Sequence, residues 1–257
     1  MQKVLILNKV PVDNLTAKKF KRIILEWSRQ RQKRVVLYLN TNGLINYIEN
    51  SEFSKIFKLA DIIHADGWGP IYASRLSKTR LPERVNVTDV IDDLLEKFNI
   101  QKTRIYLLGC KHKEVKKTAN TINKRYPGIT ICGYHGGFFP KRYEPKIVKA
   151  IANSNPDLVL IGMGTKFGAS ISYQELFISK NFKKLPNAVY WAVGGLFYYI
   201  SGQKLRAPKW MRTNGLEWLF RFFQEPKRLW RRYTITNLKF AYYTIGFLIK
   251  HSLFLKS

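Results

Sequence analysis

The sequence predicts an α/β fold, a mostly parallel sheet with helices on both faces, followed by a basic helical C-terminal appendage. Short apolar runs alternate with segments of helical periodicity, and glycines gather just after the apolar runs. Strands separated by helices of this length form βαβ units with right-handed crossovers. A change of composition near residue 204 divides the chain into a sheet domain, residues 1–203, and an appendage, residues 204–257.

The strand series is expected to begin at residues 4–8. This apolar run is too short for a signal peptide, so we interpret it as the first strand of the sheet and expect the domain to stay in the cytoplasm. The other expected strands span residues 35–40, 61–65, 104–109, 129–133, 157–162 and 188–193. Helices are expected at 16–33 with Thr16 as N-cap, around 45–59, from a Thr88 cap through 89–95, at 114–126 and at 144–152.

The charge balance is strongly basic. Forty-five Lys and Arg against seventeen Asp and Glu give a net charge of +28, which implies a polyanionic partner: nucleic acid, anionic lipid headgroups or a pyrophosphate substrate. The hydrophobic fraction of 46% is that of a folded protein with a normal core. Cys110 and Cys132 fall in apolar strand-like runs, which favours reduced, buried thiols over a disulfide.

The appendage combines basic and aromatic residues. Residues 204–257 contain twelve Lys and Arg and two acids, a net charge of +10. Their longest apolar stretch, residues 240–249, is too short to span a bilayer. Helices of this type lie in the headgroup region, where each Lys or Arg contributes about 1 kcal/mol. The alternative is a pair of helices that dock on the domain and leave their charges in solvent. This alternative is stronger for the part of the appendage up to Phe223 than for the part beyond Pro226.

Glycines at one edge of the sheet indicate a ligand that bears phosphate. The carboxyl ends of parallel strands meet at that edge, and glycine lets backbone N–H groups approach a phosphate closely. Taken singly, each is more often a turn residue. No Walker loop occurs, and no Gly-x-Gly-x-x-Gly opens the first helix, which disfavours ATPase and standard dinucleotide sites. The glycines concerned are Gly67, Gly69, Gly109, Gly133, Gly136, Gly137, Gly162, Gly164, Gly194 and Gly195.

Asp66 is the candidate catalytic carboxylate. It follows a buried strand at this edge and could act as general base toward a substrate hydroxyl, although an Asp-Gly pair there is also typical of a turn or helix cap. Thr41 and Asn42 follow the preceding strand and either orient a sugar or phosphate or cap the next helix. His64 is expected to point into the packing between layers, and His135, among glycines, is a candidate ligand contact.

A metal site is not expected. The sequence has no Asp-x-Asp motif, Asp92 and Asp93 fall inside a predicted helix, and the four histidines are scattered. The charge on a phosphate leaving group must then be stabilised by Arg, Lys and backbone amides.

Four blocks of residues in order resemble the WecG/TagA/CpsF family of bacterial glycosyltransferases over nearly the whole chain. The first is Thr41-Asn42 with Ala65-Asp66-Gly67-Trp68-Gly69. The second is Leu107-Leu108-Gly109, Tyr126-Pro127-Gly128-Ile129 and Gly133-Tyr134-His135-Gly136-Gly137-Phe138. The third is Asn155-Pro156-Asp157, Gly162-Met163-Gly164 and Gln174-Glu175. The fourth is Val193-Gly194-Gly195, Phe197, Gly202, Arg206-Ala207-Pro208, Gly215-Leu216-Glu217-Trp218-Leu219-Phe220-Arg221 and Glu225-Pro226 with Arg228.

The resemblance implies an inverting, metal-independent enzyme with a Rossmann-like core. It implies transfer of a sugar, N-acetylmannosamine being favoured, from a UDP donor to a polyprenyl-diphosphate-linked saccharide during teichoic acid or cell-surface polysaccharide synthesis. Such an enzyme works as a peripheral protein at the cytoplasmic face of the cell membrane. By matching residues, Asp66 takes the general-base role beside Thr41, with glycine-loop amides and Arg206, Arg212, Arg221 and Arg228 meeting the charge of UDP or of the acceptor diphosphate.

Three departures from the family pattern leave the donor sugar open. Residues 166–173 look longer and altered before Gln174-Glu175, Tyr198 stands where an acid is frequent, and Val87-Thr88-Asp89 replaces Gly-x-Asp. UDP-glucose or a uronic acid donor, used for capsule or exopolysaccharide, is therefore an alternative, and an inactive scaffold is another. A basic nucleic-acid-binding protein is disfavoured by the glycine-edged sheet and by the clustering of aromatics at one end. Self-association is left open.

Overall fold

A six-stranded, fully parallel sheet forms the centre of the protein, with the strand order β4-β3-β8-β7-β5-β6. The computed structural model describes residues 2–77, 79–164 and 173–254, with the side chains of 228, 232 and 250–254 outside the description. The strands are β3 (Arg34–Leu39), β4 (Ile62–Ala65), β5 (Arg104–Gly109), β6 (Thr130–His135), β7 (Leu158–Gly162) and β8 (Val189–Ala192). The predicted α/β fold is confirmed.

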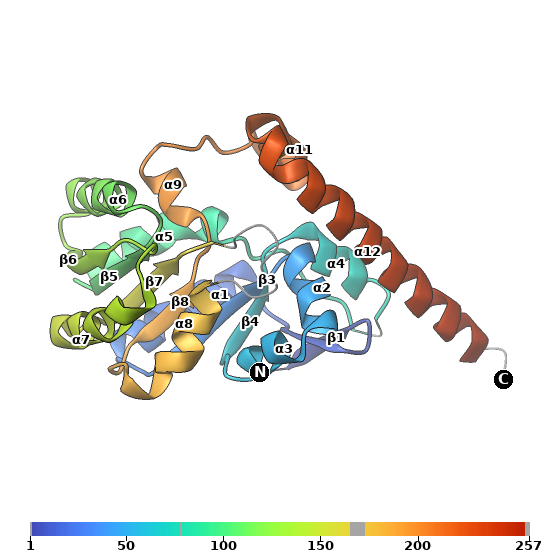
Figure 1. Cartoon of the computed structure of the whole chain (residues 1–257), viewed down its shortest axis with the longest axis horizontal. Coiled ribbons are helices and arrows are strands. Elements are labelled where there is room, and N and C mark those ends of the chain that lie inside the picture. Colours follow the sequence, from blue (N-terminus) through green and yellow to red (C-terminus); the bar gives the residue numbers. More distant parts are fainter. Residues whose placement is uncertain (1, 78, 165–172, 255–257) are drawn as a thin grey trace.

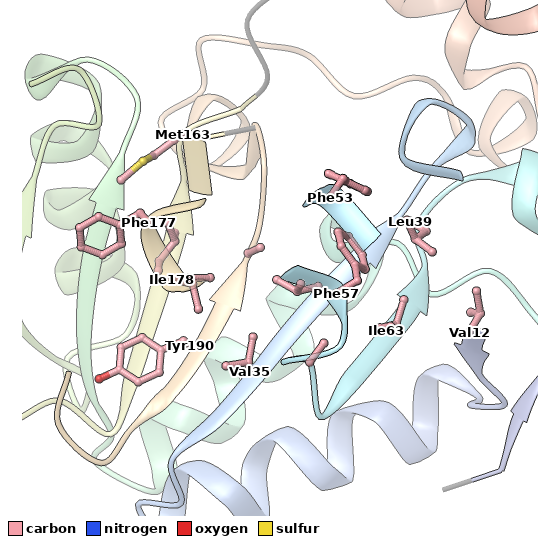
Figure 2. Close-up of a cluster of buried hydrophobic side chains, with 14 of the residues drawn as sticks. Val12, Val35, Leu39, Phe53, Phe57, Ile63, Met163, Phe177, Ile178 and Tyr190 are labelled. Carbon is pink, nitrogen blue, oxygen red and sulfur yellow. The ribbon is translucent and has the colours of Figure 1, made fainter. Parts of the chain in front are cut away.

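Helices cover both faces of the sheet, as the continuous apolar strands require. Along β3, Val35 and Leu39 point into one core while Val36 points into the other. Figure 2 shows the first core, where Phe53 and Phe57 meet the sheet. That face is covered by α2 (Thr41–Glu49), α3 (Ser51–Phe57), α4 (Trp68–Ser74), α7 (Glu144–Ser154) and α8 (Tyr173–Asn181), and the opposite face by α1 (Ala17–Arg29), α5 (Val87–Ile100), α6 (His112–Arg125) and α9 (Leu196–Ile200).

The strand expected at residues 4–8 is present, but its expected place in the parallel sheet was wrong. β1 (Lys3–Ile6) pairs antiparallel with β2 (Val10–Asp13) in a separate hairpin. The connecting loop has three residues, 7–9, because Ile6 pairs with Val10. Leu7 and Asn8 both have positive φ, 51° and 55°, and the Lys9 N–H donates to the Ile6 carbonyl at 3.1 Å. A carboxylate oxygen of Asp13 accepts the Ile63 N–H at 2.7 Å and holds the hairpin beside the main sheet.

Side-chain caps set the helix boundaries, and two of them differ from expectation. Thr16 caps α1 as predicted, accepting a hydrogen bond from the Lys19 N–H. Asn86, not Thr88, caps α5, and Thr88 lies in its first turn. The expected helix at 45–59 is two helices, because the Asn50 side chain accepts two backbone N–H groups and starts α3.

In the described part of the chain, three helices follow residue 204: α10 (Lys209–Thr213), α11 (Glu217–Gln224) and α12 (Pro226–Phe254). In Figure 1, α12 runs diagonally past α2 and α4 and away from the sheet. Its inner side chains Phe240 and Phe247 pack on the first core, and Glu49 of α2 accepts from Lys239 at 2.7 Å. Among the described residues, no helix combines the length and apolar character that crossing a membrane requires.

Candidate active site

A half-open cavity of about 310 Å³ lies at the carboxyl ends of β3 and β4, beneath the C-terminal helices. One wall comes from the sheet edge and the helices that follow β3 and β4, and the other from α11, α12 and the loop before α11. The sheet-side lining includes Asn40, Thr41, Asn42, Asp66, Gly67, Trp68, Gly69, Tyr72, Arg84 and Asn86. The C-terminal lining includes Gly215, Glu217, Trp218, Arg221, Leu229, Tyr233, Thr236, Asn237 and Phe240.

Asp66 stands where β4 ends and is fixed at both its backbone and its carboxyl group. Its N–H donates to the Leu39 carbonyl at 2.9 Å, its carbonyl accepts from Asn86, and Oδ1 accepts the Val87 N–H at 3.2 Å. Burial raises the pKa of Asp66 to about 6, against the lowering effect of the Arg221 charge, the Val87 hydrogen bond and the Arg84 charge. A carboxyl group with this pKa suits proton abstraction near neutral pH.

Thr41 and Asn42 open α2 and face the same cavity. Neither caps the helix, because Asn40 does so by accepting the Gly43 N–H. The alternative in which Thr41 or Asn42 serves only as the cap is therefore wrong. Gly67 is the N-cap residue of α4, and its extended backbone leads from Asp66 into that helix. The sheet edge thus presents a hydroxyl, an amide and a carboxyl group to one cavity.

Two arginines line the cavity beside Asp66, one from each wall. Arg84 precedes α5, and its guanidinium lies over the Trp68 ring at 5.8 Å. Arg84 Nη1 donates to Glu217 Oε2 at 2.9 Å, and Arg221 Nη2 donates to the other oxygen of Glu217. The C-terminal segment therefore supplies both a cation and the carboxylate that binds two cations.

Arg206 and Arg212 are not among the residues that line the cavity. Arg206 and Arg212 both bind Oδ1 of Asp89, near the start of α5, and Arg206 also donates to the Thr88 carbonyl at 2.6 Å. These contacts fasten the segment to the domain. The Arg228 side chain lies outside the described residues.

Two of the other predicted glycines, Gly109 and Gly162, lie where neighbouring backbones come close together. A Cβ on Gly109 would stand 2.3 Å from the Gly162 carbonyl oxygen, and one on Gly162 would stand 2.9 Å from that of Gly194. Gly194 has φ of 56° and lies against the Tyr38 hydroxyl. These three are required where the backbones of β5, β7 and β8 end close together. Gly164 and Gly195 face open space.

His135 and Gly136 lie at the far end of the sheet from Asp66. β6 is the opposite edge strand from β4, and the His135 ring packs between His112 and Phe139. Gly136 lies against the His112 backbone. A second cavity, of about 180 Å³, is lined there by Gly137, Phe138, Phe139, Met163, Gly164 and Tyr173.

Gln174 and Glu175 are buried in α8, where Gln174 contacts Gly194 at the carboxyl end of β8. Gln174 accepts the Gly194 N–H at 3.1 Å and donates to Glu175 and to the Tyr38 hydroxyl. Burial raises the pKa of Glu175 to about 7. Of the altered segment 166–175, residues 166–172 lie outside the described residues. Tyr198, in α9, packs against the core on the face of the sheet that α1, α5 and α6 cover, and Lys204 lies over its ring.

His64 is buried as predicted, with Nδ1 at 2.8 Å from the Val85 carbonyl oxygen and its ring against Phe20. Within the described ranges, no group of three or more His, Cys, Asp or Glu side chains is placed to hold a metal ion.

Sequence reasoning did not single out Arg84, Trp68 or Tyr233 as site residues. No sequence pattern pointed to Arg84, because the Asn86 cap of α5 and its hydrogen bond to the Asp66 carbonyl appear only in the structure. Trp68 was part of the first motif block but was not assigned a role, and Tyr233 had no signal, since aromatic residues in helices are usually core residues.

Comparison with known proteins identifies the family of this chain. The family model described as "Glycosyl transferase WecG/TagA/CpsF family" matches residues 4–253. A Bacillus subtilis (strain 168) protein named N-acetylglucosaminyldiphosphoundecaprenol N-acetyl-beta-D-mannosaminyltransferase is 33% identical over 216 residues, 82% of this chain and 81% of its own length. Proteins of the same name from Bacillus spizizenii and Staphylococcus aureus (strain MW2) are 30% and 28% identical, covering 81% and 73% of this chain and 78% and 71% of their own lengths. The chain therefore belongs to the WecG/TagA/CpsF family of glycosyltransferases.

Proposed function

We propose that the protein is an inverting enzyme that transfers N-acetylmannosamine from a UDP donor to N-acetylglucosamine carried on undecaprenyl diphosphate. The observation that supports this most directly is the Asp66 carboxyl group, raised in pKa and facing a cavity beside two arginines. The printed activity of the relatives supplies the sugar and the acceptor. UDP-glucose and uronic acid donors remain the alternatives to be tested.

The reaction is a single displacement. An acceptor hydroxyl oxygen attacks the anomeric carbon while its proton passes to the Asp66 carboxylate. The bond between the anomeric carbon and the phosphate oxygen breaks, and UDP leaves with the electron pair, so configuration inverts. Arg84 and Arg221 line the cavity, so their guanidinium groups can stabilise the negative charge that develops on the leaving phosphate. No metal cofactor is needed in this scheme.

We further propose that residues 204–257 hold the protein on the cytoplasmic face of the membrane. On α12, an outer stripe of apolar side chains recurs at helical spacing and is 50–72% exposed. It consists of Ile235, Leu238, Tyr242, Ile245 and Ile249. The inner face of the same helix lines the cavity through Tyr233 and Phe240. A helix with apolar residues on both sides and basic residues between them can bind the domain and the headgroup region together.

The test is a panel of UDP-N-acetylmannosamine, UDP-N-acetylglucosamine, UDP-glucose and UDP-glucuronic acid with a short polyprenyl-diphosphate-N-acetylglucosamine acceptor. UDP release is measured with and without EDTA. We expect turnover with UDP-N-acetylmannosamine only, unaffected by EDTA. Turnover with another donor alone would reject the sugar, and loss of turnover in EDTA would reject the metal-free scheme.

A further inference from the structure

Asp66 pairs with neither of the two arginines that share its cavity. Its one side-chain hydrogen bond is to the Val87 N–H, and among the described side chains no ion pair includes it. The charged or titratable side chains that line the cavity with it are Tyr72, Arg84, Glu217, Arg221 and Tyr233. A carboxylate in such surroundings normally forms a two-pronged pair with a guanidinium.

Glu217 explains why Asp66 has no arginine partner, because Glu217 binds the guanidinium groups of both Arg84 and Arg221. One of its oxygens accepts from Arg84 and the other from Arg221, 2.9 Å and 2.5 Å away. Arg84 has a second carboxylate, Asp89, at 2.5 Å. For Arg221, Glu217 is the sole carboxylate partner among the described side chains. Only 8% of Glu217 is exposed, so water competes poorly for these contacts.

Glu217 stays ionised over the range in which Asp66 titrates. Burial raises the pKa of Glu217, but the Arg221 charge and the Arg84 hydrogen bond outweigh it and hold that pKa below its usual value. Its charge therefore competes with Asp66 for the two arginines throughout that range. An arginine paired directly with Asp66 would lower the pKa of Asp66 by about 1–3 units and occupy the lone pairs that must accept a proton.

We propose that Glu217 is a positioning residue that binds Arg84 and Arg221 so that neither pairs with Asp66, which leaves the base open to the acceptor hydroxyl. The proposal rests on the proposed function, in which Asp66 is the base. It also makes the C-terminal segment a condition for basicity, because Glu217 lies at the start of α11 and reaches the cavity only when that helix is docked.

The experiment compares the whole protein with its Glu217→Gln variant. Glu225→Gln is the matched control, since it removes a carboxylate from the same segment whose partner, Lys204 at 2.7 Å, lies outside the cavity lining. The Asp66 carboxyl group is titrated by carbon-13 NMR and assigned with Asp66→Asn. In Glu217→Gln we expect its midpoint to fall by about 1 pH unit or more. The acid limb of kcat/KM should shift equally, with kcat at pH 8 reduced about tenfold.

Two further variants separate positioning from a merely structural role. Adding Arg221→Gln to the Glu217→Gln variant removes the competing cation and should return the Asp66 midpoint toward the wild-type value. Glu217→Asp, whose shorter side chain reaches one guanidinium, should give an intermediate shift and serves if Glu217→Gln does not fold. An unchanged or raised Asp66 midpoint in folded variants would overturn the proposal. If the midpoint falls but the wild-type protein transfers no sugar, the proposed function fails and the Glu217 relationship stands.

Discussion

Gly69 lies so close to Thr41 that a Cβ atom on residue 69 would stand 2.2 Å from the Thr41 hydroxyl oxygen. This contact brings the start of α4 against the start of α2. Because Asp66 precedes α4 and Thr41 begins α2, the same contact places the hydroxyl and the carboxyl group in one cavity.

Gly69→Ala should therefore damage both stability and activity. The added methyl must displace Thr41 or the backbone of α4, which costs about 1–3 kcal/mol and moves the Thr41 hydroxyl. Thermal unfolding and UDP release measure the two effects. Gly246→Ala in α12 is the control, since nothing lies within 4 Å of its Cβ position, and it should raise stability slightly through helix propensity. Equal behaviour of the two variants would contradict the packing argument.

Asp66→Asn should abolish turnover while making the protein more stable at neutral pH. The folded-state pKa, about 6, exceeds the ordinary 3.8, so folding favours the protonated group and the charged form destabilises the protein above pH 6. Removing that charge should add about 1–2 kcal/mol at pH 8 and progressively less below pH 6. Turnover should fall at least about 100-fold. Chemical denaturation at pH 5 and pH 8, with UDP release, tests both; a stability change independent of pH would reject the assignment.

Asp89→Asn should loosen the segment that follows residue 204. Asp89 binds Arg84, Arg206 and Arg212 together. Burial raises its pKa, but these hydrogen bonds and charges outweigh burial and leave the pKa below 3.8. The stability from Asp89 is present above pH 3.8 and lost as pH falls below it. We expect a loss of about 1–2 kcal/mol at pH 7, because three arginines share this partly exposed carboxylate as a network, and faster proteolysis after residue 204.

The control for that variant is Asp93→Asn, which lies on α5 like Asp89 and breaks an exposed pair with Lys21 of α1. Such pairs contribute about 0–1 kcal/mol. Proteolysis that is equally slow in both variants would show that Asp89 does not fasten the segment.

The outer stripe of α12 should govern binding to anionic vesicles. Changing Leu238, Tyr242 and Ile245 to Ser should reduce co-sedimentation with phosphatidylglycerol vesicles at least about tenfold, while thermal unfolding changes little because these side chains are exposed. The matched control replaces three exposed side chains elsewhere, Leu5, Ile100 and Tyr143, with Ser. Similar losses in both variants would point away from the stripe as the lipid-binding surface.

The sequence was informative where one residue determines local geometry. Thr16 and the apolar runs located the helix and strands that alternate through the sheet, and Asp66 after a buried strand indicated the edge at which the cavity lies. The sequence did not predict contacts between segments that are far apart in the chain. Glu217 reads as an ordinary helix-start acid, and its role depends on Arg84, 133 residues away in the chain. The Leu7-Asn8 turn was missed because it uses left-handed backbone without glycine.

The order in which the pocket is built differs from the order in which the core is built. All six strands of the parallel sheet lie before residue 193, whereas Glu217, Arg221 and Tyr233 lie after it. During translation, the sheet therefore emerges from the ribosome before the second wall of the cavity exists. A product that ends near residue 205 would have every strand of that sheet and the Asp66 carboxyl group. Asp66 would face bulk water, and Glu217 would be missing as the partner that binds Arg84. Premature termination in this region should thus yield folded but inert protein.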